Sequence, residues 1–578
     1  MCPPGPAGQE TLQLKLSPER LTGFPRRSYN FRDQLPSIRY IPRGKAERND
    51  MMGIKRLRTF LKNMLRLAGL LLMVLTAAGG LTSCRLFGRP SEAEVGAVYL
   101  RQTLEALPDY PTSTPQPTAP RPTLPSEFEG PSSAYAPPTP LPRRDSDSYR
   151  YITSAGDTPR GLAGRFNVDP QLVTSQADTA PGEYLAPGVE FSFPDNLPQT
   201  TAAQRLLPDA EVVFSPTAAD FSLYTAIQEA GGFLAGYQEV IGRGRVMTGT
   251  EMVARVARDQ SINPRLLLAV IEYRSGWLYG NPPGAERDRY PLGFRISHQE
   301  GLYDELRVAA TQLNLAYYGW REGTFTSIHY QDGGEQRLEP TLNAGTAALY
   351  HLFSYFYTQS EIDQVLLGDR GFLIRYQNIF GDPWARADQT GPLLPADLEQ
   401  PPLNLPFGKG EKWGYTGGPH ATWNPGTPRG ALDFAPVTGE ARCAVSRKWV
   451  TAPARAVVAR AADNAVILDL DGDGHENTGW AVLLFHLAES SLVEEGVWVN
   501  ADARLGRPSC QGGFSTGTHV HLARKYNGEW LAADGPVPLV LSGWTAQAGE
   551  DPYQGWLVKG EAVVVADPGG KVGSTLIR

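Results

Sequence analysis

The stretch that decides the fold of the C-terminal third is WGYTGGPHATWNPGTPRGALDF, residues 413–434. A glycine-rich run leads to His420, and a short apolar run encloses Asp433. A second cluster, STGTHVH, ends at His521. Because alternate residues of a β-strand face the same side, we expect His519 and His521 to project into one cleft. The pattern predicts a β domain that gathers histidines from separate strands or loops.

Zinc is the metal that this set of residue types favours. Catalytic zinc sites are tetrahedral, with three nitrogen or oxygen ligands from the protein and water in the fourth position. His420, Asp433 and His521 have the residue types for one such site, with a single Zn²⁺ as cofactor. The metal would lower the pKa of its water and polarise a scissile carbonyl. His486, in the run LLFHL, and His519 are then available to move protons and stabilise an oxyanion.

These residues resemble the lysostaphin-type zinc metallopeptidases, and most closely their β-lytic endopeptidase branch. Common members of that family carry a histidine four residues before the aspartate, where this chain has Arg429. In the β-lytic branch the first ligand follows Gly-Gly-Pro and precedes the aspartate by thirteen residues, which is the spacing found here. The resemblance covers most of residues 403–544. It implies two sets of site residues: the zinc ligands His420, Asp433 and His521, and the catalytic pair His486 and His519.

The resemblance also implies a substrate. Members of the family hydrolyse peptide bonds in peptidoglycan, so the stem peptide or the cross-bridge is the expected target, with Gly-rich linkages as candidates. Two other classes remain open. One is a non-enzymatic peptidoglycan-binding regulator of other wall hydrolases, which the retention of all the implied site residues disfavours. The other is a lytic transglycosylase, which the helical region described below disfavours.

The N-terminus carries a predicted export signal. Basic residues within 55–66 precede an apolar run over 67–81, as in secretory signals, and the run is short of the roughly twenty residues that span a membrane. It ends in Leu-Thr-Ser-Cys84, which resembles the lipobox of bacterial lipoproteins. That resemblance implies lipidation of Cys84 and anchoring to the outer face of the cytoplasmic membrane, facing the cell wall. Residues 51–84 are thus the predicted signal peptide, and residues 1–50 an unstructured or mis-started N-terminus.

A spacer and a small module are expected next. Residues 85–147 include PTSTPQPTAPRPTLP, a composition with too little apolar surface for a core, and are predicted to be a linker. Residues 148–197 resemble a LysM domain, a β-α-α-β module that binds N-acetylglucosamine-containing glycans. The matching residues are Gly156-Asp157-Thr158, Ala163, Arg165-Phe166, Leu185 and Pro187-Gly188. The chain departs from that family at Ser175-Gln176, where asparagine is usual, and a structural spacer is the alternative.

A helical region follows a connecting segment over residues 198–249. Residues 250–395 have apolar residues at helical spacing and resemble the lysozyme-like domain of lytic transglycosylases, through motifs such as Arg274-Ser275-Gly276. In that family the residue before Ser-Gly is the catalytic glutamate, but Arg274 stays protonated and cannot act as a general acid. Glu272 lies two residues earlier, about 200° round a helix, and is expected to face away from the cleft. We therefore predict a glycan-holding domain without glycosidase activity.

The composition bears on the possible partners and on the kind of scaffold. The 54 Lys and Arg residues nearly balance the 61 Asp and Glu residues, without the basic stripe that nucleic acid requires. Four cysteines exclude a disulfide-dense scaffold, but Cys443 and Cys510 can pair if the chain is exported. Three histidines outside the motifs are interpreted as packed core residues: His298, His329 and His351.

An acidic loop, DLDGDGHENTGW, has the alternate spacing of a calcium site at Asp469, Asp471 and Asp473. Position twelve is Trp480 instead of the usual glutamate, so a hairpin turn is favoured over a calcium site. The complete prediction is a multidomain α+β chain, with a LysM-like module, a helical lysozyme-like domain and, over residues 396–578, an antiparallel β peptidase domain.

Overall fold

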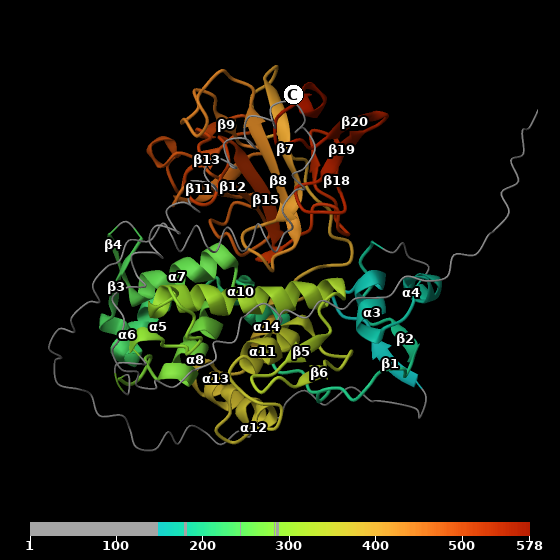
Figure 1. Ribbon diagram of the computed structural model, residues 1–578, viewed down its shortest axis with the longest axis vertical. Helices are drawn as coiled ribbons and strands as arrows, with labels where there is room; N and C mark the ends of the chain where they lie inside the picture. Colours follow the sequence, from blue (N-terminus) through green and yellow to red (C-terminus); the bar gives the residue numbers. More distant parts are fainter. Residues whose placement is uncertain (1–147, 178–181, 243, 282–283, 285–287) are drawn as a thin grey trace, which may run out of the picture. The chain divides into compact units, whose positions relative to one another are not determined.

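The structure is a computed structural model, and it describes residues 148–177, 182–242, 244–281, 284 and 288–578. The described residues fall in one compact unit, with a small β-α module, a helical region and a β region (Figure 1). None of the described helices combines the length and apolar character that a membrane span requires. The predicted signal peptide, the linker and the lipidation site at Cys84 lie outside the described residues.

The small module has the β-α-α-β order expected from the sequence. Strands β1 (Ser148–Ile152) and β2 (Glu190–Pro194) pair antiparallel, and helices α3 (Pro159–Phe166) and α4 (Pro170–Ala177) lie between them in the chain. Alternate strand residues point inward, so aromatic rings from both strands pack around Phe166. The resemblance to LysM domains is neither supported nor opposed by this order alone and stays a prediction.

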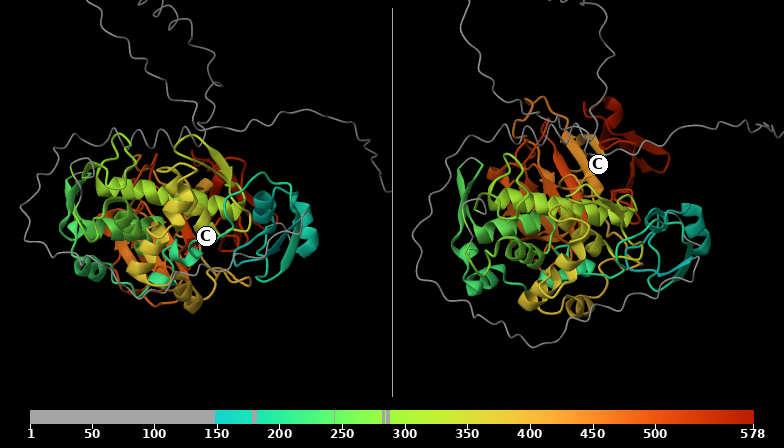
Figure 2. Two further views of the ribbon diagram at one scale, coloured as in Figure 1. Left: turned by 90° about the horizontal axis from the view of Figure 1, so that it is seen from below. Right: turned by 60° about the horizontal axis from the view of Figure 1, so that its bottom comes forward.

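Residues that carried that resemblance hold the module together. The buried carboxylate of Asp157 accepts hydrogen bonds from the Tyr151 hydroxyl and the Ser154 amide, and pairs with buried Arg165 at 2.5 Å. The module lies at one end of helix α10 (Gly301–Glu322), as both views of Figure 2 show. A Cβ at Gly164 would lie 2.1 Å from the carbonyl oxygen that follows this helix, so glycine permits the close contact.

Helices form the next region, with two short hairpins. The helices are α5 (Leu223–Ala230), α6 (Phe233–Gly236), α7 (Gly249–Gln260), α8 (Pro264–Ser275), α10, α11 (Ala344–Ser354), α12 (Ile362–Leu367), α13 (Phe372–Phe380) and α14 (Pro383–Thr390). The hairpins pair β3 (Gln238–Ile241) with β4 (Arg245–Thr248), and β5 (Ser327–His329) with β6 (Glu335–Arg337). Local signals explain the boundaries: Thr248 and Glu251 form a capping box for α7, and Pro264 begins α8 after Asn263 caps it.

The segment 198–249 belongs to this helical core. Leu206, Val212, Ile227 and Met247 are buried in the same apolar cluster as the residues of α8 and α10. Its helices are short and separated by Pro and Gly. They are too short for apolar residues at helical spacing to be recognised in the sequence. The predicted connecting segment is therefore a folded part of the helical region.

Arg274 and Glu272, the residues at issue in the lysozyme-like prediction, both have structural partners. Arg274 donates to the Leu292 carbonyl at 2.8 Å, and its guanidinium lies 3.9 Å from the centre of the Phe356 ring. Glu272 accepts hydrogen bonds from the backbone amides just after α8. Burial raises the pKa of the Glu272 carboxyl. Neither side chain is arranged as a free general acid, and the lysozyme-like assignment stays a prediction.

The interpretation of the three remaining histidines is partly wrong. His351 is a packed residue: its Nε2 lies 3.0 Å from Gln312 Oε1, and burial lowers its pKa to about 4. His298 and His329 are exposed. On β5 the two-residue alternation turns Ile328 inward and His329 outward, while His298 occupies the loop before α10 at a positive φ of 64°.

The antiparallel β region is confirmed. Its large sheet has the order β13-β10-β11-β12-β15-β8-β7-β21, with β16 also paired to β15, and the central strands lie side by side in Figure 1. These strands are β7 (Lys412–Ala421), β8 (Arg429–Pro436), β10 (Ala456–Ala462), β11 (Ala465–Asp469), β12 (Trp480–Phe485), β13 (Trp498–Val499), β15 (Val520–Tyr526), β16 (Glu529–Trp530) and β21 (Thr575–Ile577). Smaller sheets pair β9 (Val450–Thr451) with β14 (Arg504–Gly506), and order β17 (Val540–Leu541), β18 (Trp544–Ala548), β19 (Gly555–Lys559) and β20 (Ala562–Val565).

Both faces of the large sheet are covered. Ile467 and Leu483 belong to the apolar cluster of the helical region, whereas their strand neighbours Leu468 and Leu484 belong to a second cluster on the other face. This follows from the two-residue period of a strand. The helical region therefore packs on one face of the sheet, and the two regions share a single apolar core on that face.

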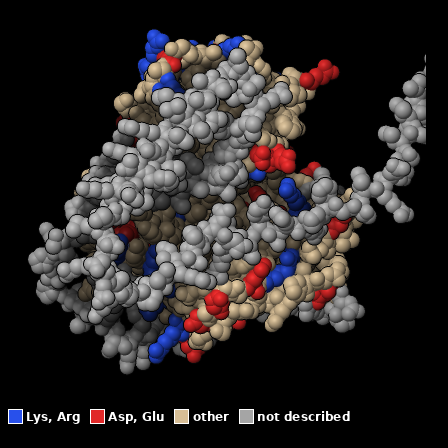
Figure 3. All heavy atoms as spheres, viewed as in Figure 1, with Lys and Arg blue, Asp and Glu red and all other residues tan. Residues whose placement is uncertain are grey.

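Buried charges cross the boundary between these regions. Arg460 on β10 bonds Asp259 of α7 at 2.5 Å and Glu476 at 3.1 Å, and Lys525 of β15 reaches Glu476 at 3.0 Å. All four side chains are buried, so each charge depends on the others for compensation. On the face drawn in Figure 3, by contrast, the exposed acidic and basic side chains of the described residues are interspersed.

We predict that Arg460→Met destabilises the fold by about 3–5 kcal/mol, because it leaves buried carboxylates without their partner. The free energy of unfolding in urea at pH 7 measures this effect. The matched control is Arg245→Met, because Arg245 pairs with Asp463 but is 54% exposed; such a pair contributes about 1 kcal/mol or less. Equal losses in both variants would contradict the prediction.

The same cluster predicts a dependence on pH. Burial opposes the ionisation of Glu476, but Arg460 and Lys525 outweigh it and hold the pKa of this carboxyl below its ordinary value of 4.5. A carboxyl with a lowered pKa stabilises the fold above its unfolded pKa, and this contribution is lost as the pH falls through the folded pKa. The stability difference between wild type and Arg460→Met is therefore expected to shrink below about pH 4.5. A difference that is constant down to pH 3 would count against this account.

Candidate metal centre

Neighbouring strands bring the predicted ligands together. Asp433 on β8 and His521 on β15 are direct partners in the sheet. His420 reaches them because the pairing of β7 with β8 is irregular on both sides of Gly417, which faces Asp433. A Cβ at Gly417 would lie 2.5 Å from Asp433 Oδ2. Glycine at this position is therefore needed to leave room for the carboxylate.

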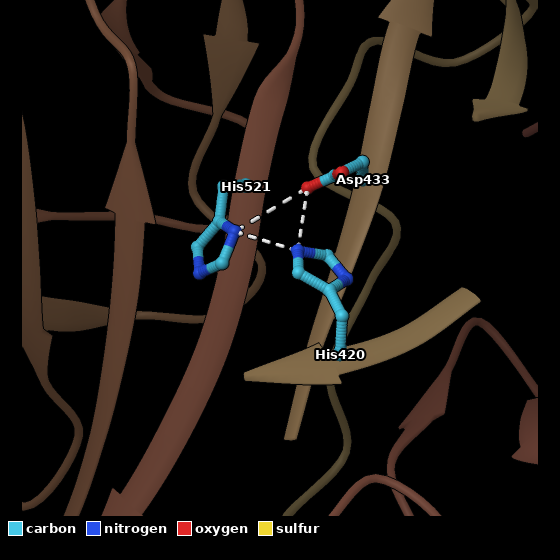
Figure 4. Close-up of side chains that lie close together, drawn as sticks. All are labelled: His420, Asp433 and His521. Atoms are coloured by element: carbon cyan, nitrogen blue, oxygen red, sulfur yellow. Dashed lines mark hydrogen bonds and ion pairs between the residues drawn. The ribbon is translucent and has the colours of Figure 1, made fainter. Parts of the chain in front are cut away.

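The three ligand atoms converge at the spacing of a zinc site. His420 Nε2 lies 3.1 Å from His521 Nδ1 and 3.4 Å from Asp433 Oδ1, and the last two atoms are 3.3 Å apart (Figure 4). Tetrahedral zinc with bonds of about 2.0–2.1 Å separates its ligand atoms by about 3.3–3.4 Å. All three side chains are buried, and Asp433 Oδ1 accepts no hydrogen bond. The residues fit a zinc ion.

The other imidazole nitrogens fix which atoms face this point. His420 Nδ1 lies 2.8 Å from the Gly418 carbonyl oxygen, and His521 Nε2 lies 2.8 Å from the Thr422 carbonyl oxygen. Because a carbonyl oxygen accepts and never donates, each of these nitrogens carries the proton. The facing nitrogens, His420 Nε2 and His521 Nδ1, are then lone-pair donors. Two lone pairs and a carboxylate oxygen thus meet without a proton between them, an arrangement that a cation would satisfy.

The charge states suit metal binding. Burial lowers the pKa of His521 below its ordinary value. Burial opposes ionisation of Asp433, but positive charge on His420 and His519 outweighs it and holds the pKa of that carboxyl well below its usual range. With the imidazoles neutral, a bound cation would supply that positive charge. Neutral imidazole and ionised carboxylate are the forms that bind metals.

The predicted catalytic pair lies beside this centre. The rings of His486 and His519 are 4.6 Å apart, and His519 Nε2 lies 3.7 Å from Asp433 Oδ1. Each ring bonds a backbone carbonyl through Nδ1, at Gln511 and Gly517 respectively, so Nε2 is the basic nitrogen of both. Burial lowers the pKa of His486 below its ordinary value, which favours the neutral imidazole, the form that can accept a proton. His486 also has a left-handed backbone, with φ of 65°.

Sequence reasoning missed Tyr553. Its ring stacks on His420 with centroids 4.1 Å apart, and its backbone bonds the Gly418 amide and the Pro419 carbonyl. Arg429, at the place where common family members carry a histidine, donates to the carbonyl oxygens of Gly549 and Glu550 in the same loop. The sequence around Tyr553 contains no motif that predicts its stacking on His420, because this contact depends on how segments far apart in the chain pack together.

A disulfide joins Cys443 to Cys510, with Cα atoms 5.1 Å apart. The bond ties the loop after β8 to the segment before Gln511, whose carbonyl oxygen accepts from His486. The predicted pairing is therefore present in the structure, next to the residue whose carbonyl orients His486.

The acidic loop is a hairpin connection between β11 and β12. Asp469 is buried, and its carboxylate accepts hydrogen bonds from the backbone amides of Asp471, Gly472 and Gly474. The carboxylates of Asp469, Asp471 and Asp473 lie close enough to hold a metal, but the first of them is occupied with shaping the turn. The hairpin connection is present as predicted, and the preference for a turn over a calcium site stays a prediction.

The fold and the centre define a chain in which an antiparallel β region carries a candidate zinc site beside a helical region. Comparison with known proteins adds particular relatives. The family described as LasA, N-terminal domain, matches residues 205–395, a span that crosses the boundary drawn at residue 249 from the sequence. Protease LasA of Pseudomonas aeruginosa is 28% identical over 295 residues, which cover 48% of this chain and 65% of that protein. Protease LasA of another strain is 29% identical over 294 residues. The chain thus spans slightly less than two thirds of the curated relatives that it matches.

Solved structures are similar to a smaller part of the chain. The metalloprotease pseudoalterin, from the deep sea, is 24% identical, covers 28% of this chain and 94% of its own, and has a TM-score of 0.25. The catalytic domain of lysostaphin, an antimicrobial peptidase from Staphylococcus simulans, is 23% identical, covers 21% of this chain and 89% of its own, and has a TM-score of 0.16.

We predict that the double variant Cys443→Ser, Cys510→Ser is less stable than the oxidised protein by about 2–5 kcal/mol, the usual range for removing a native disulfide. Urea unfolding without reductant measures the difference. Reductant is expected to lower the stability of the wild type to that of the variant and to leave the variant unchanged. If the variant matches the oxidised protein, the bond contributes nothing to stability.

Proposed function

We propose that this chain is a zinc metalloendopeptidase that hydrolyses peptide bonds of peptidoglycan, in the stem peptide or the cross-bridge. The observation that carries the proposal is the meeting of two imidazole lone pairs and a buried carboxylate oxygen at the spacing of a tetrahedral zinc site. The match to proteins named Protease LasA supports it, as does the resemblance to lysostaphin-type enzymes noted in the sequence.

The residues of the centre have distinct roles in this proposal. His420, Asp433 and His521 would hold one Zn²⁺, which polarises a scissile carbonyl and lowers the pKa of water. His486 and His519 present a basic Nε2 beside the centre, where they can take a proton from the attacking water and return it to the leaving amine. Their Nδ1 bonds to backbone carbonyls fix the orientation of each ring.

The rest of the chain would bring this centre to the wall. In the proposal the protein is exported and anchored through a lipid on Cys84, with residues 85–147 as its tether. The module over residues 148–197 and the helical region over 250–395 would hold N-acetylglucosamine-containing glycan, the latter without glycosidase activity. The structural partners of Arg274 support the absence of glycosidase activity, and the glycan-holding roles rest on the resemblances noted in the sequence.

We predict that His420→Ala and His521→Ala abolish stoichiometric zinc binding, because each removes one of three ligands. Elemental analysis of the purified protein measures the zinc content, and mass spectrometry of digested peptidoglycan measures cleavage. New free amino and carboxyl termini in the wild-type digest are expected, and both are expected to be lost in the variants. The control is His329→Ala, an exposed histidine on β5.

This experiment also separates the competing classes. A wild type that binds no zinc and cuts nothing would favour a non-enzymatic regulator of other wall hydrolases. Anhydro-sugars that persist in His521→Ala would favour a lytic transglycosylase.

We predict a different result for His486→Ala, which removes a proton-transfer group and leaves the three ligands in place. Zinc content is expected to stay at the wild-type level, while kcat falls by roughly 10²- to 10⁴-fold, the usual contribution of a general acid or base. Steady-state kinetics on a synthetic peptide that the wild type cuts, with zinc analysis of the same sample, provide the measurement. Loss of zinc together with activity would instead place His486 among the ligands.

A further inference from the structure

A short turn joins the candidate centre to the helical region. The turn follows β7 and spans residues 422–428. Its first carbonyl, that of Thr422, accepts the Nε2–H of His521 at 2.8 Å. The turn is closed by its own hydrogen bonds: the Thr427 hydroxyl donates to the Asn424 carbonyl at 2.8 Å and accepts from the Trp423 amide at 3.2 Å. The carbonyl that accepts from His521 therefore belongs to a compact turn that is closed by its own hydrogen bonds.

The other side of the turn is held by helices. The side-chain amide of Asn424 donates to Gln260 Oε1, at the end of α7, at 2.5 Å, and to Thr311 Oγ1, on α10, at 2.9 Å. Gln260 is buried. Gly426 has a positive φ of 103°, and a Cβ there would lie 2.9 Å from the backbone nitrogen of Leu315 on α10. The turn thus touches both helices and cannot shift without them.

We propose that Asn424 is a positioning residue for the metal centre, through which helices α7 and α10 set the orientation of the His521 imidazole. The inference rests on the zinc site of the proposed function and extends it to a residue that contacts neither the metal nor the substrate. A backbone carbonyl that receives the second nitrogen of a ligating histidine fixes its tautomer and ring orientation. Here the position of that carbonyl depends on a hydrogen bond made by another region of the chain.

The test is the zinc affinity of Asn424→Ala in the full chain, measured at pH 7 by competition with a chromophoric chelator. We expect the affinity to fall by about 10- to 100-fold, as for other groups that orient a ligand. Loading with Co²⁺ alone gives a second readout, because its visible absorption reports the geometry of the ligands. The spectrum of Asn424→Ala is expected to differ from that of the wild type.

The matched control is Asn477→Ala. Asn477 is also buried at the boundary with the helical region, where its amide donates to the Ser215 carbonyl at 2.7 Å, but it is not attached to the turn or to a ligand. We expect it to lose stability without losing zinc affinity. Thr311→Val is a second variant, which removes the acceptor on α10 and leaves Asn424 in place, and is expected to weaken zinc binding as well. It decides the matter if Asn424→Ala does not fold.

The outcomes are distinct. Unchanged zinc affinity and an unchanged Co²⁺ spectrum in folded Asn424→Ala, or an equal loss in Asn477→Ala, overturn the inference. A wild type that binds no zinc overturns the proposed function and this inference with it. A wild type that binds zinc with the expected dependence on Asn424, but cuts no peptide, overturns the proposed catalysis and supports the positioning role.

Discussion

The structure depends on one electrostatic constraint: the facing nitrogens of His420 and His521 and the oxygen Oδ1 of Asp433 meet in a buried place without a proton to share. Burying two lone pairs and a carboxylate oxygen next to one another is unfavourable unless a cation binds between them. Other features near the site serve this meeting. The irregular pairing of β7 with β8 lets His420 reach Asp433 and His521. Gly417 leaves room for the Asp433 carboxylate, and backbone carbonyls accept from the imidazole nitrogens that face away from the centre.

The helical region is more than a neighbour of this centre. It covers one face of the sheet that carries the ligands, and its buried Asp259 pairs with Arg460 of that sheet. Buried charges contribute little net stability when they are paired, but they are costly when they are not. They therefore oppose any arrangement of the two regions in which the partners do not meet. The turn over residues 422–428 adds a direct route from the helices to a ligand.

Much of the site could be predicted from the sequence. Strand alternation is a local signal that places His519 and His521 on one side, and the thirteen-residue spacing from His420 to Asp433 carries the resemblance to the β-lytic branch. Other parts could not. The stacking of Tyr553 and the role of Thr422 depend on contacts between distant segments, and a carbonyl oxygen has no signature in a side-chain pattern. The exposure of His329 was predicted wrongly because a three-residue strand carries too short an alternation to show its inward face. The folded state of the segment 198–249 could not be predicted, because its helices are too short and too interrupted to show a periodic apolar pattern.

The left-handed backbone of His486 costs stability at a residue whose side chain is proposed to contribute to activity. A non-glycine residue in that conformation costs roughly 1–2 kcal/mol, and glycine or asparagine would adopt it more easily. Laboratory evolution that rewards heat resistance alone would thus tend to discard this imidazole, whereas evolution under selection for turnover would keep it. Populations screened by the two criteria should diverge at this codon early, which makes it a convenient marker of what a screen has rewarded.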